Sequence, residues 1–369
     1  MSVQSEAPQS LLIDVGVLSC GCTDHVLDVM HKALAEDDGG IWRPHESVFL
    51  RDLVEQITQR GAGSLKGLAD ALEVWFGKGG GKAPAVADPR AQAIFQALAQ
   101  KPVAQWSAGE CSVLIDYLVR QHFPDEFVQE MALALSKQAA LMGRLQAANP
   151  DLTLAQVASV ASRLALPGAL QHALDLANLH RDMLAFGEAQ CADRIQGLTD
   201  AMRHKIKAII LDHQRTVRLE GSAGEALQTR LFDVFGEINR DWRRIALTEA
   251  GEMANQGLIA SCAPGEKLER VEQYQGACAF CRKIDGAVAT VVPASKPDKD
   301  WDTEIWPGKS NVGRSASPYR RIGGQLVKRA PSEMWTLPAG LVHPHCRGRW
   351  VRLGGGAKDD PLTGWLFKD

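Results

Sequence analysis

The sequence predicts an α+β protein that is predominantly α-helical, with helical N-terminal and central regions followed by a small loop-rich module that contains β-structure. Apolar residues recur at steps of three and four along most of the first 262 residues, which is typical of helices that bury one face. After residue 262 this periodicity ends, and glycine, proline, tryptophan and arginine become frequent. Short alternating runs and paired cysteine and histidine residues take its place.

Residues 1–76 form the predicted N-terminal helical region. Its helical segments are "HESVFLRDLVEQITQ" and "LKGLADALEVWF", whose apolar positions fall on one helical stripe. Residues 77–89, "GKGGGKAPAVADP", follow as a predicted linker, because glycine removes backbone restraint and proline cannot continue a helix.

The predicted helical domain spans residues 90–262. Capping boxes at 107–110 ("SAGE") and 153–156 ("TLAQ") each predict a helix start, because these side chains bind the free N–H groups of a first turn. The Pro-Gly pair at 167–168 predicts a helix end. The strongest helical periodicity runs from Glu225 to about Ile259.

Residues 263–353 form the predicted loop-rich module, and residues 354–369 form a C-terminal tail. In "RKIDGAVATVV" the Asp-Gly pair at 285–286 stands between two strand-like runs and predicts a hairpin turn, since both positions tolerate positive φ. The alternating "RWVRL" at 349–353 predicts a strand. In the tail, Trp365 and Phe367 are expected to anchor the chain end.

Composition describes a soluble globular chain with one strongly basic segment. The net charge is −3, but between Lys309 and Arg352 nine basic residues accompany a single acid, Glu333, which gives +8 within 44 residues. No run approaches the roughly 20 apolar residues that span a bilayer, and no secretory signal is visible. We therefore expect no membrane contact, and synthesis in a reducing cytoplasm with its cysteines as free thiols or metal ligands.

Two paired motifs in the module predict a metal site. Cys278 and Cys281 form a Cys-x-x-Cys knuckle, and His343 and Cys346 form a His-x-x-Cys pair. Zn²⁺ binds four such ligands tetrahedrally, and three cysteines with one histidine are a common structural set. The predicted cofactor is therefore a structural Zn²⁺. About 60 residues separate the two pairs, more than the ~12–20 that are usual in zinc fingers.

Other interpretations of these residues remain open. His345 could replace His343 as the ligand. The Cys-x-x-Cys pair could be a redox pair, although such motifs open a helix after a strand and a hairpin turn is expected here. The same cysteines could also be buried thiols without a ligand. A second cluster, formed by Cys20, Cys22, His25 and His31, matches no standard metal-site spacing and is expected to be core or surface residues.

The basic segment is either a solvated surface or a contact for nucleic acid. Few acids are available to pair with its cations, and tryptophan and tyrosine residues are interleaved with them. A non-specific DNA contact would use these six side chains: Lys309, Arg314, Arg320, Arg321, Lys328 and Arg329.

The order of motifs resembles the C-terminal domain of the phage Mu F-like minor head (head morphogenesis) proteins. Three motifs carry the resemblance: a helix with Thr248 and Glu249, the "CAFCRKIDG" knuckle, and "PAGLVHPHCRGRW" with Pro338, His343, Pro344, Cys346 and Arg347. The chain departs from the family at Gly348, where a second cysteine is often found. The resemblance covers roughly residues 180–353; residues 1–165 carry none, and the loop from 293 to 337 is longer than expected.

The resemblance implies a structural virion protein that associates with the portal protein or the major capsid protein during head assembly. Its expected location is the capsid interior or the portal, after synthesis in the host cytoplasm. A zinc-stabilised nuclease of the HNH type is the alternative. The residues after Cys346 argue against it, because "RGRWVRLGGG" is strand-like and offers no further histidine, aspartate or asparagine ligand.

Overall fold

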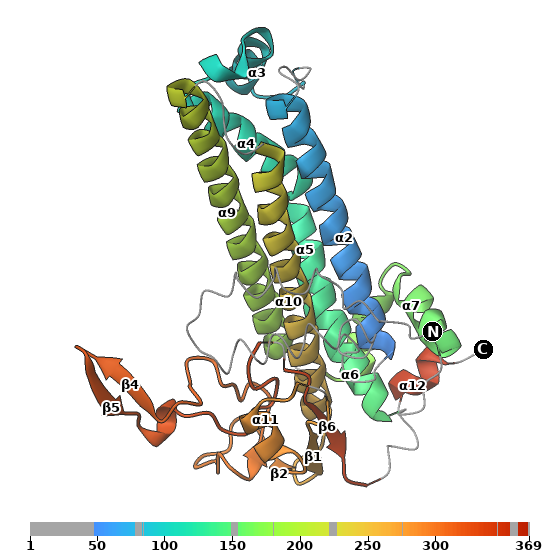
Figure 1. Cartoon of the computed structure of the whole chain (residues 1–369). Helices are drawn as coiled ribbons and strands as arrows, with labels where there is room; N and C mark the ends of the chain where they lie inside the picture. The colour runs from blue at the N-terminus through green and yellow to red at the C-terminus, as the bar shows by residue number, and fades with distance from the viewer. Residues whose placement is uncertain are drawn as a thin grey trace, which may run out of the picture. The chain divides into compact units, whose positions relative to one another are not determined.

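The computed structural model describes residues 48–77, 83, 85–148, 154–179, 181–220, 227–274, 276–344, 346–354 and 361–367 (Figure 1). These residues form a mostly helical α+β protein with a small sheet near the C-terminus, which confirms the predicted fold class. Residues 1–47, which include the early cluster of Cys20, Cys22, His25 and His31, lie outside the described residues, as do residues 78–82 and 84 of the predicted linker.

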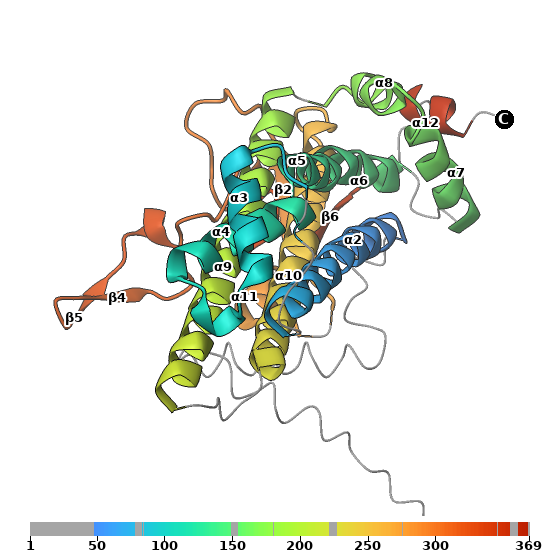
Figure 2. The same ribbon diagram turned by 90° about the horizontal axis from the view of Figure 1, so that it is seen from above.

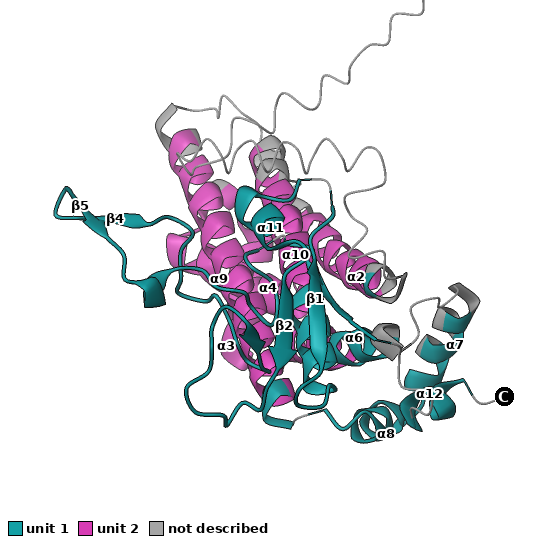
Figure 3. Ribbon diagram, turned by 90° about the horizontal axis from the view of Figure 1, so that it is seen from below, with its two compact units in different colours: residues 1–52, 139–183, 250–369 teal, residues 53–138, 184–249 magenta. Residues whose placement is uncertain are grey.

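Two compact units divide the chain, and each is assembled from separate stretches (Figure 3). Unit 1 comprises residues 1–52, 139–183 and 250–369, and unit 2 comprises residues 53–138 and 184–249. The division differs from the predicted boundary at residue 262. It falls inside helix α10, Leu227–Ala260, because the last two turns of this helix pack with the C-terminal module.

Unit 2 is helical in its described residues. It contains most of α2 (Val48–Leu72), of α9 (Arg181–Glu220) and of α10. It also contains the π-turn Glu73–Gly77, α3 (Pro89–Gln100), the 3-10 turn Val103–Gln105, α4 (Ala108–His122), α5 (Asp125–Leu133) and the π-turn Ala134–Gln138. The predicted capping box at the start of α4 is confirmed, because the Ser107 side chain accepts the Glu110 N–H and the Glu110 carboxylate accepts the Ser107 N–H at 2.7 Å.

Unit 1 combines shorter helices with the sheet. The helices are α6 (Ala139–Ala148), α7 (Leu154–Leu164), α8 (Ala169–Leu176), the end of α10, α11 (Ala279–Ile284), the 3-10 turn Pro331–Glu333 and α12 (Pro361–Leu366). The strands are β1 (Lys267–Val271), β2 (Val288–Val291), β3 (Glu304–Ile305), β4 (Tyr319–Ile322), β5 (Gln325–Lys328) and β6 (Arg349–Arg352).

The sheet packs on the C-terminal end of α10. Strands β3, β2, β1 and β6 lie in that order; β1 pairs antiparallel with β2 and β6, while β2 and β3 are parallel. Leu258 and Ile259 of α10 share one buried cluster with Leu268 of β1, Val291 of β2 and Trp350 of β6. This core fixes the position of the loops that follow β1 and precede β6.

Helices α6 and α10 approach each other closely within unit 1. A side chain at Gly257 would overlap the backbone carbonyl of Ala140, and one at Gly143 would overlap that of Ala254. The two glycines therefore allow backbone contact at the crossing, which buries Met142 and Leu145 of α6.

The predicted hairpin at Asp285-Gly286 is wrong. The residues before it form helix α11, and β2 pairs with β1 across the sheet. Two side chains explain the difference: Cys278 caps the helix, and the Asp285 carboxylate accepts the N–H of Glu272 at 2.8 Å. Asp285 thus ties the helix end to the end of β1.

Other sequence predictions hold where residues are described. The predicted strand at 349–353 is β6, and the segment with the strongest predicted helical periodicity is α10. In α12 the Trp365 ring meets the His172 ring at a centroid distance of 5.0 Å, so the tail is anchored within unit 1. In the described parts of the chain, no helix is both long and apolar enough to cross a membrane.

Candidate metal centre

The two cysteines of the knuckle lie on the first turn of α11. Cys278 is the N-cap residue of this helix, and its Sγ accepts the N–H of Cys281 at 3.4 Å. A sulfur atom can serve in this capping position, where serine or aspartate is usual. Because the Cys-x-x-Cys spacing spans one helical turn, both sulfur atoms face the same side.

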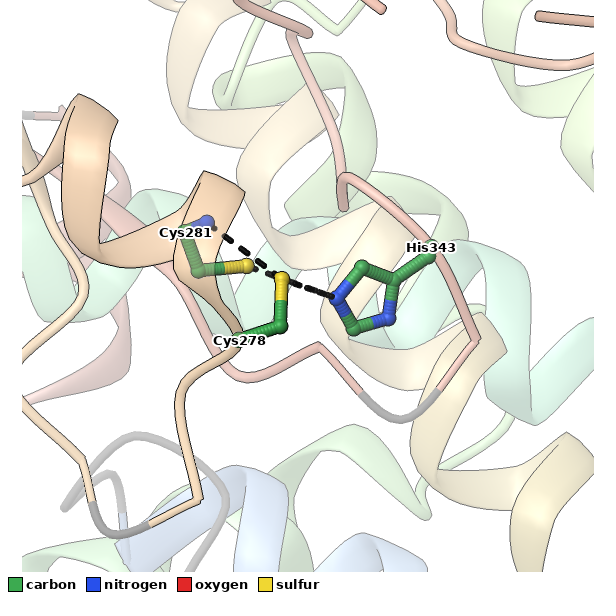
Figure 4. A group of neighbouring side chains, drawn as sticks. All are labelled: Cys278, Cys281 and His343. Carbon is green, nitrogen blue, oxygen red and sulfur yellow. Dashed lines mark hydrogen bonds between the residues drawn. The ribbon is translucent and has the colours of Figure 1, made fainter. Parts of the chain in front are cut away.

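The loop between the 3-10 turn Pro331–Glu333 and β6 brings His343 to these sulfur atoms. The His343 Nε2 lies 3.3 Å from the Cys278 Sγ and 3.4 Å from the Cys281 Sγ (Figure 4). The other ring nitrogen, Nδ1, lies 2.7 Å from the Pro344 carbonyl oxygen, and the ring stacks on Trp335 with centroids 5.5 Å apart. A proton on Nδ1 that binds this carbonyl leaves Nε2 free as a donor atom.

Cys278, Cys281 and His343 therefore form a group that could hold a metal ion, since their donor atoms all lie within 4.8 Å of one another. Cys346 is close by: its buried Sγ lies 3.9 Å from the Cys281 Sγ. It falls in a second donor group, with Glu272 and Cys281, rather than in the first. The structure thus brings together the residues of both predicted motifs. His345, the alternative ligand, lies outside the described residues.

Three donors surround the Cys346 sulfur. The Arg270 Nη2 donates to it from 3.7 Å, the Tyr274 hydroxyl from 3.8 Å and the Gly348 N–H from 3.5 Å. Such contacts stabilise a thiolate and hold it in place, as the partners of metal ligands commonly do.

A buried ion pair between Arg270 and Glu272 lies next to Cys346. The Arg270 Nε donates to Glu272 at 2.8 Å, and both side chains are fully buried. Arg270 also donates to the Gly340 carbonyl oxygen at 2.8 Å, and its guanidinium lies 5.5 Å from the centre of the Trp350 ring. Burial raises the pKa of Glu272 to about 7, although Arg270 opposes this shift. Arg270 therefore links β1, the loop before the histidine, and the Cys346 sulfur.

The same ion pair explains why residue 348 is a glycine. A side chain at this position would overlap the Glu272 carboxylate and the Arg270 guanidinium. The cysteine that the Mu F-like proteins often carry here therefore cannot be accommodated while Glu272 occupies its present place.

The pKa values of the three cysteines and of His343 are shifted in different directions. A hydrogen bond from Cys281 lowers the pKa of Cys278 to about 4, and the same contact raises the pKa of Cys281 well above its ordinary value. Burial disfavours a charged His343, but its hydrogen bond to Cys278, the charge of Cys346 and the hydrogen bond to the Pro344 carbonyl together outweigh this and raise its pKa to about 9. For Cys346, a hydrogen bond from Cys281 and the charge of Arg270 overcome burial and lower the pKa. Without a metal, these interactions favour a thiolate at Cys278, a thiol at Cys281 and an imidazolium at His343 at neutral pH.

The sequence-based argument against a redox pair is wrong, because Cys278 does open a helix after a strand. The presence of His343 and Cys346 beside the two cysteines now distinguishes a metal site from a redox pair. A dithiol pair needs only two sulfur atoms, whereas here a histidine nitrogen contacts both of them and Cys346 contacts one.

A polar edge of α10 holds the loop that carries His343, and the sequence analysis missed it. The Glu252 carboxylate accepts the Leu341 N–H at 2.6 Å, and the Gln256 side chain accepts the Gly308 N–H at 2.8 Å. Asn255 donates to the Gly348 carbonyl oxygen and accepts the Trp350 N–H, both at 3.0 Å. Polar residues at positions i, i+3 and i+4 within the apolar end of the helix are the signal that could have revealed it, and Asn255 and Gln256 are buried.

The two motif residues on the preceding turn lie elsewhere. Glu249 is buried and forms an ion pair with Arg194 of α9, within unit 2. Neither Thr248 nor Glu249 belongs to the metal-binding groups found among the described residues.

The six cations proposed for DNA contact have different environments. Lys309 is buried, and its ammonium group donates to the carbonyl oxygens of Trp301 and Glu304 at 2.6 and 2.8 Å. Burial lowers its pKa to about 8. Lys309 therefore cannot reach a surface partner, and this part of the prediction is wrong.

The other five cations retain some exposure. Arg314 is half-buried: its guanidinium lies 4.2 Å from the centre of the Trp301 ring and donates to the Met334 carbonyl oxygen. Arg320, Arg321 and Lys328 are exposed on strands β4 and β5, and Arg329 follows them half-buried.

Comparison with known proteins gives no relative for this chain: no protein-family model matches it, and neither does any curated protein or solved structure.

Proposed function

We propose that the chain is a structural assembly protein, a minor head protein of a tailed phage or prophage, whose C-terminal module is held together by one structural Zn²⁺. The observation that carries the proposal is the convergence of the knuckle cysteines, His343 and Cys346 from two motifs about 60 residues apart. These are the motifs on which the resemblance to the Mu F-like proteins rests, and a loop-rich segment of this length needs a link between its ends.

The donor distances support zinc. With Zn–S near 2.3 Å and Zn–N near 2.0 Å, neighbouring donors of a tetrahedron lie about 3.5–3.8 Å apart. The three measured distances within the cluster are 3.3, 3.4 and 3.9 Å. Cys346 is the donor that has to adjust, and we expect its Sγ to turn from Glu272 toward the other three when the metal binds.

The residues around the donors fit a structural role. A metal closed in by four protein ligands crosslinks the chain, whereas a catalytic zinc keeps one position for water or substrate. The Pro344 carbonyl orients the imidazole, and Arg270 offsets the negative charge that three thiolates leave on the site. We therefore propose that the site stabilises the module and carries no catalytic activity.

The metal proposal is tested on protein purified without added metal. Elemental analysis should find about one zinc per chain, and Cys278→Ser should lose the metal and make residues 263–353 sensitive to protease. Cys262→Ser is the matched control, because Cys262 lies in the same unit and its thiol donates to the Leu258 carbonyl oxygen instead. Folded wild-type protein with almost no metal would refute the zinc site.

The head-protein proposal is tested separately. The full chain should co-migrate with the portal or major capsid protein of the same genome, and purified particles should contain it in few copies. Full-length protein suits this test better than a fragment ending at residue 262, because such a cut would divide unit 1. Particles that hold portal and capsid protein but lack this chain would contradict the proposal. Metal-dependent nicking of plasmid by the pure protein would favour the nuclease alternative.

A further inference from the structure

Strands β4 and β5 form a two-stranded ribbon that pairs with no other strand in the described part of the chain. They pair antiparallel from Tyr319↔Lys328 to Ile322↔Gln325, and the turn consists of Gly323 and Gly324 with φ of 56° and 84°. All eight side chains of the two strands are exposed. Figures 1 and 2 show the ribbon projecting away from the four-stranded sheet of the same unit.

The ribbon is held at its base. The Ser315 N–H donates to the Glu333 carbonyl oxygen at 2.9 Å, and the Trp335 N–H donates to the Ser315 carbonyl oxygen at 3.1 Å. Beyond this point Ile322 is 53% exposed and Leu326 is 67% exposed. A two-stranded hairpin of this kind is marginally stable in water by itself, so a partner that covers one face would stabilise it.

The two faces of the ribbon differ in charge. Side chains alternate along a strand, so the pairing places Tyr319, Arg321, Leu326 and Lys328 on one face, here named the Tyr319 face. Arg320 belongs to the opposite face, as does Arg329 by the same alternation. Arg320 forms an ion pair with Glu333. The cations of the Tyr319 face have no acid on their own face.

We infer that the Tyr319 face binds the phosphate backbone of duplex DNA. No aspartate or glutamate occurs between residues 305 and 332, so this part of the chain is uniformly positive. A two-stranded ribbon fits the major groove, which is about 12 Å wide. Arg321 and Lys328 are diagonal neighbours, about 7–8 Å apart in such a register, and can contact separate phosphates. The inference stands on the ribbon alone and does not depend on the proposed head function.

A protein partner fits this face less well. Its two apolar side chains, Tyr319 and Leu326, are each paired across the ribbon with a cation. Protein interfaces concentrate apolar residues at the centre and are depleted of lysine there. Stacking and cation contacts that alternate along a surface are instead typical of nucleic-acid binding.

The expected binding is weak and sensitive to salt. Two phosphate contacts give a slope of about −1.8 for log K against log salt, which amounts to roughly a tenfold loss between about 50 and 200 mM salt. The sequence alone suggested six cationic side chains for this contact. The structure reduces the number because Lys309 is buried and Arg320 is paired with Glu333.

The test compares two double variants of the full chain that change the net charge equally. Arg321→Gln with Lys328→Gln alters the Tyr319 face, and Arg320→Gln with Arg329→Gln alters the opposite face. Binding to a fluorescent duplex of about 30 base pairs is followed by anisotropy between about 50 and 200 mM salt. The first variant should lose about tenfold in affinity and most of the salt slope, and the second should stay within about threefold of wild type.

Three outcomes would overturn the inference. Equal losses in both variants would mean that total charge, and not this face, determines binding. Undetectable binding of wild-type protein at about 50 mM salt would exclude the contact itself. A dimer in sedimentation that the Arg321→Gln, Lys328→Gln variant dissociates would identify a second copy of the chain as the occupant. Thermal melting of the Arg321→Gln, Lys328→Gln variant should match wild type, because both residues are exposed on the strands.

Discussion

Asn255 is expected to be the single most important hydrogen-bonding side chain between α10 and strand β6. It is 4% exposed, and its amide donates to the carbonyl oxygen of Gly348 and accepts the N–H of Trp350, both at 3.0 Å. Gly348 and Trp350 are themselves buried. Replacing Asn255 with alanine therefore leaves a buried donor and a buried acceptor without their partner.

The loss of stability in Asn255→Ala follows from the Gly348 carbonyl and the Trp350 N–H, which both lose their hydrogen-bond partner. A buried backbone group without a hydrogen bond costs about 1–3 kcal/mol. The space left by the amide can admit one water, which would satisfy one of the two groups in part. We therefore expect Asn255→Ala to lower the free energy of unfolding of the module by about 2–4 kcal/mol.

Native-state hydrogen exchange is the appropriate assay, because it resolves the opening of residues 263–353 from that of the remaining chain. Gln273→Ala is the control: Gln273 lies in the same module, is exposed, and makes one long contact of 3.4 Å to Asp285. Its effect should stay within about 0.5 kcal/mol. If Asn255→Ala costs no more than Gln273→Ala, the amide does not hold β6 to the helix.

Two further predictions concern the metal and the helix crossing. At pH 7 the metal-free cluster carries protons on His343, with a pKa of about 9, and on Cys281, whose pKa is raised further. Both protons must leave when zinc binds, so the affinity for zinc should rise with pH by up to about two logarithmic units per pH unit near neutrality. Isothermal titration calorimetry in buffers of different ionisation enthalpy measures the number of released protons. A number near zero would contradict the proposed donor set. Gly257→Ala should lower the free energy of unfolding by about 1–3 kcal/mol, because the added methyl overlaps the backbone of α6; Gly236→Ala, whose added methyl meets no atom, should be neutral or slightly stabilising in the same denaturant titration.

The helices could be predicted because their signals are local. The periodicity of α10 and the capping box of α4 are each contained in a few turns of sequence. Helix α11 could not, because it has only six residues and depends on contacts with distant parts of the chain. The Asp285-Gly286 pair suggested a turn. The Asp285 carboxylate in fact accepts the N–H of Glu272, the residue that follows β1.

The residues of the candidate metal site were recognisable for a similar reason. Each pair has the spacing of one helical turn, which is visible in the sequence, and in the structure His343 lies beside both knuckle cysteines. The contacts around them have no such pattern. Arg270 and Glu272 look like ordinary alternating residues of an exposed strand, and only the fold shows that they are fully buried beside Cys346. Lys309 was misplaced because charge alone does not reveal burial.

The ribbon is enclosed between the two donor pairs, with α11 before it and His343 after it. Closer to the ribbon, backbone hydrogen bonds of Ser315 with Glu333 and Trp335 join the two chain segments that lead into and out of it. Residues 316–332 therefore form a cassette whose ends are already fixed, and its length and sequence can change without disturbing the core of the module. Homologous chains could exchange this cassette to recognise different partners while keeping the same donor set, and a ribbon grafted from another protein should be tolerated here.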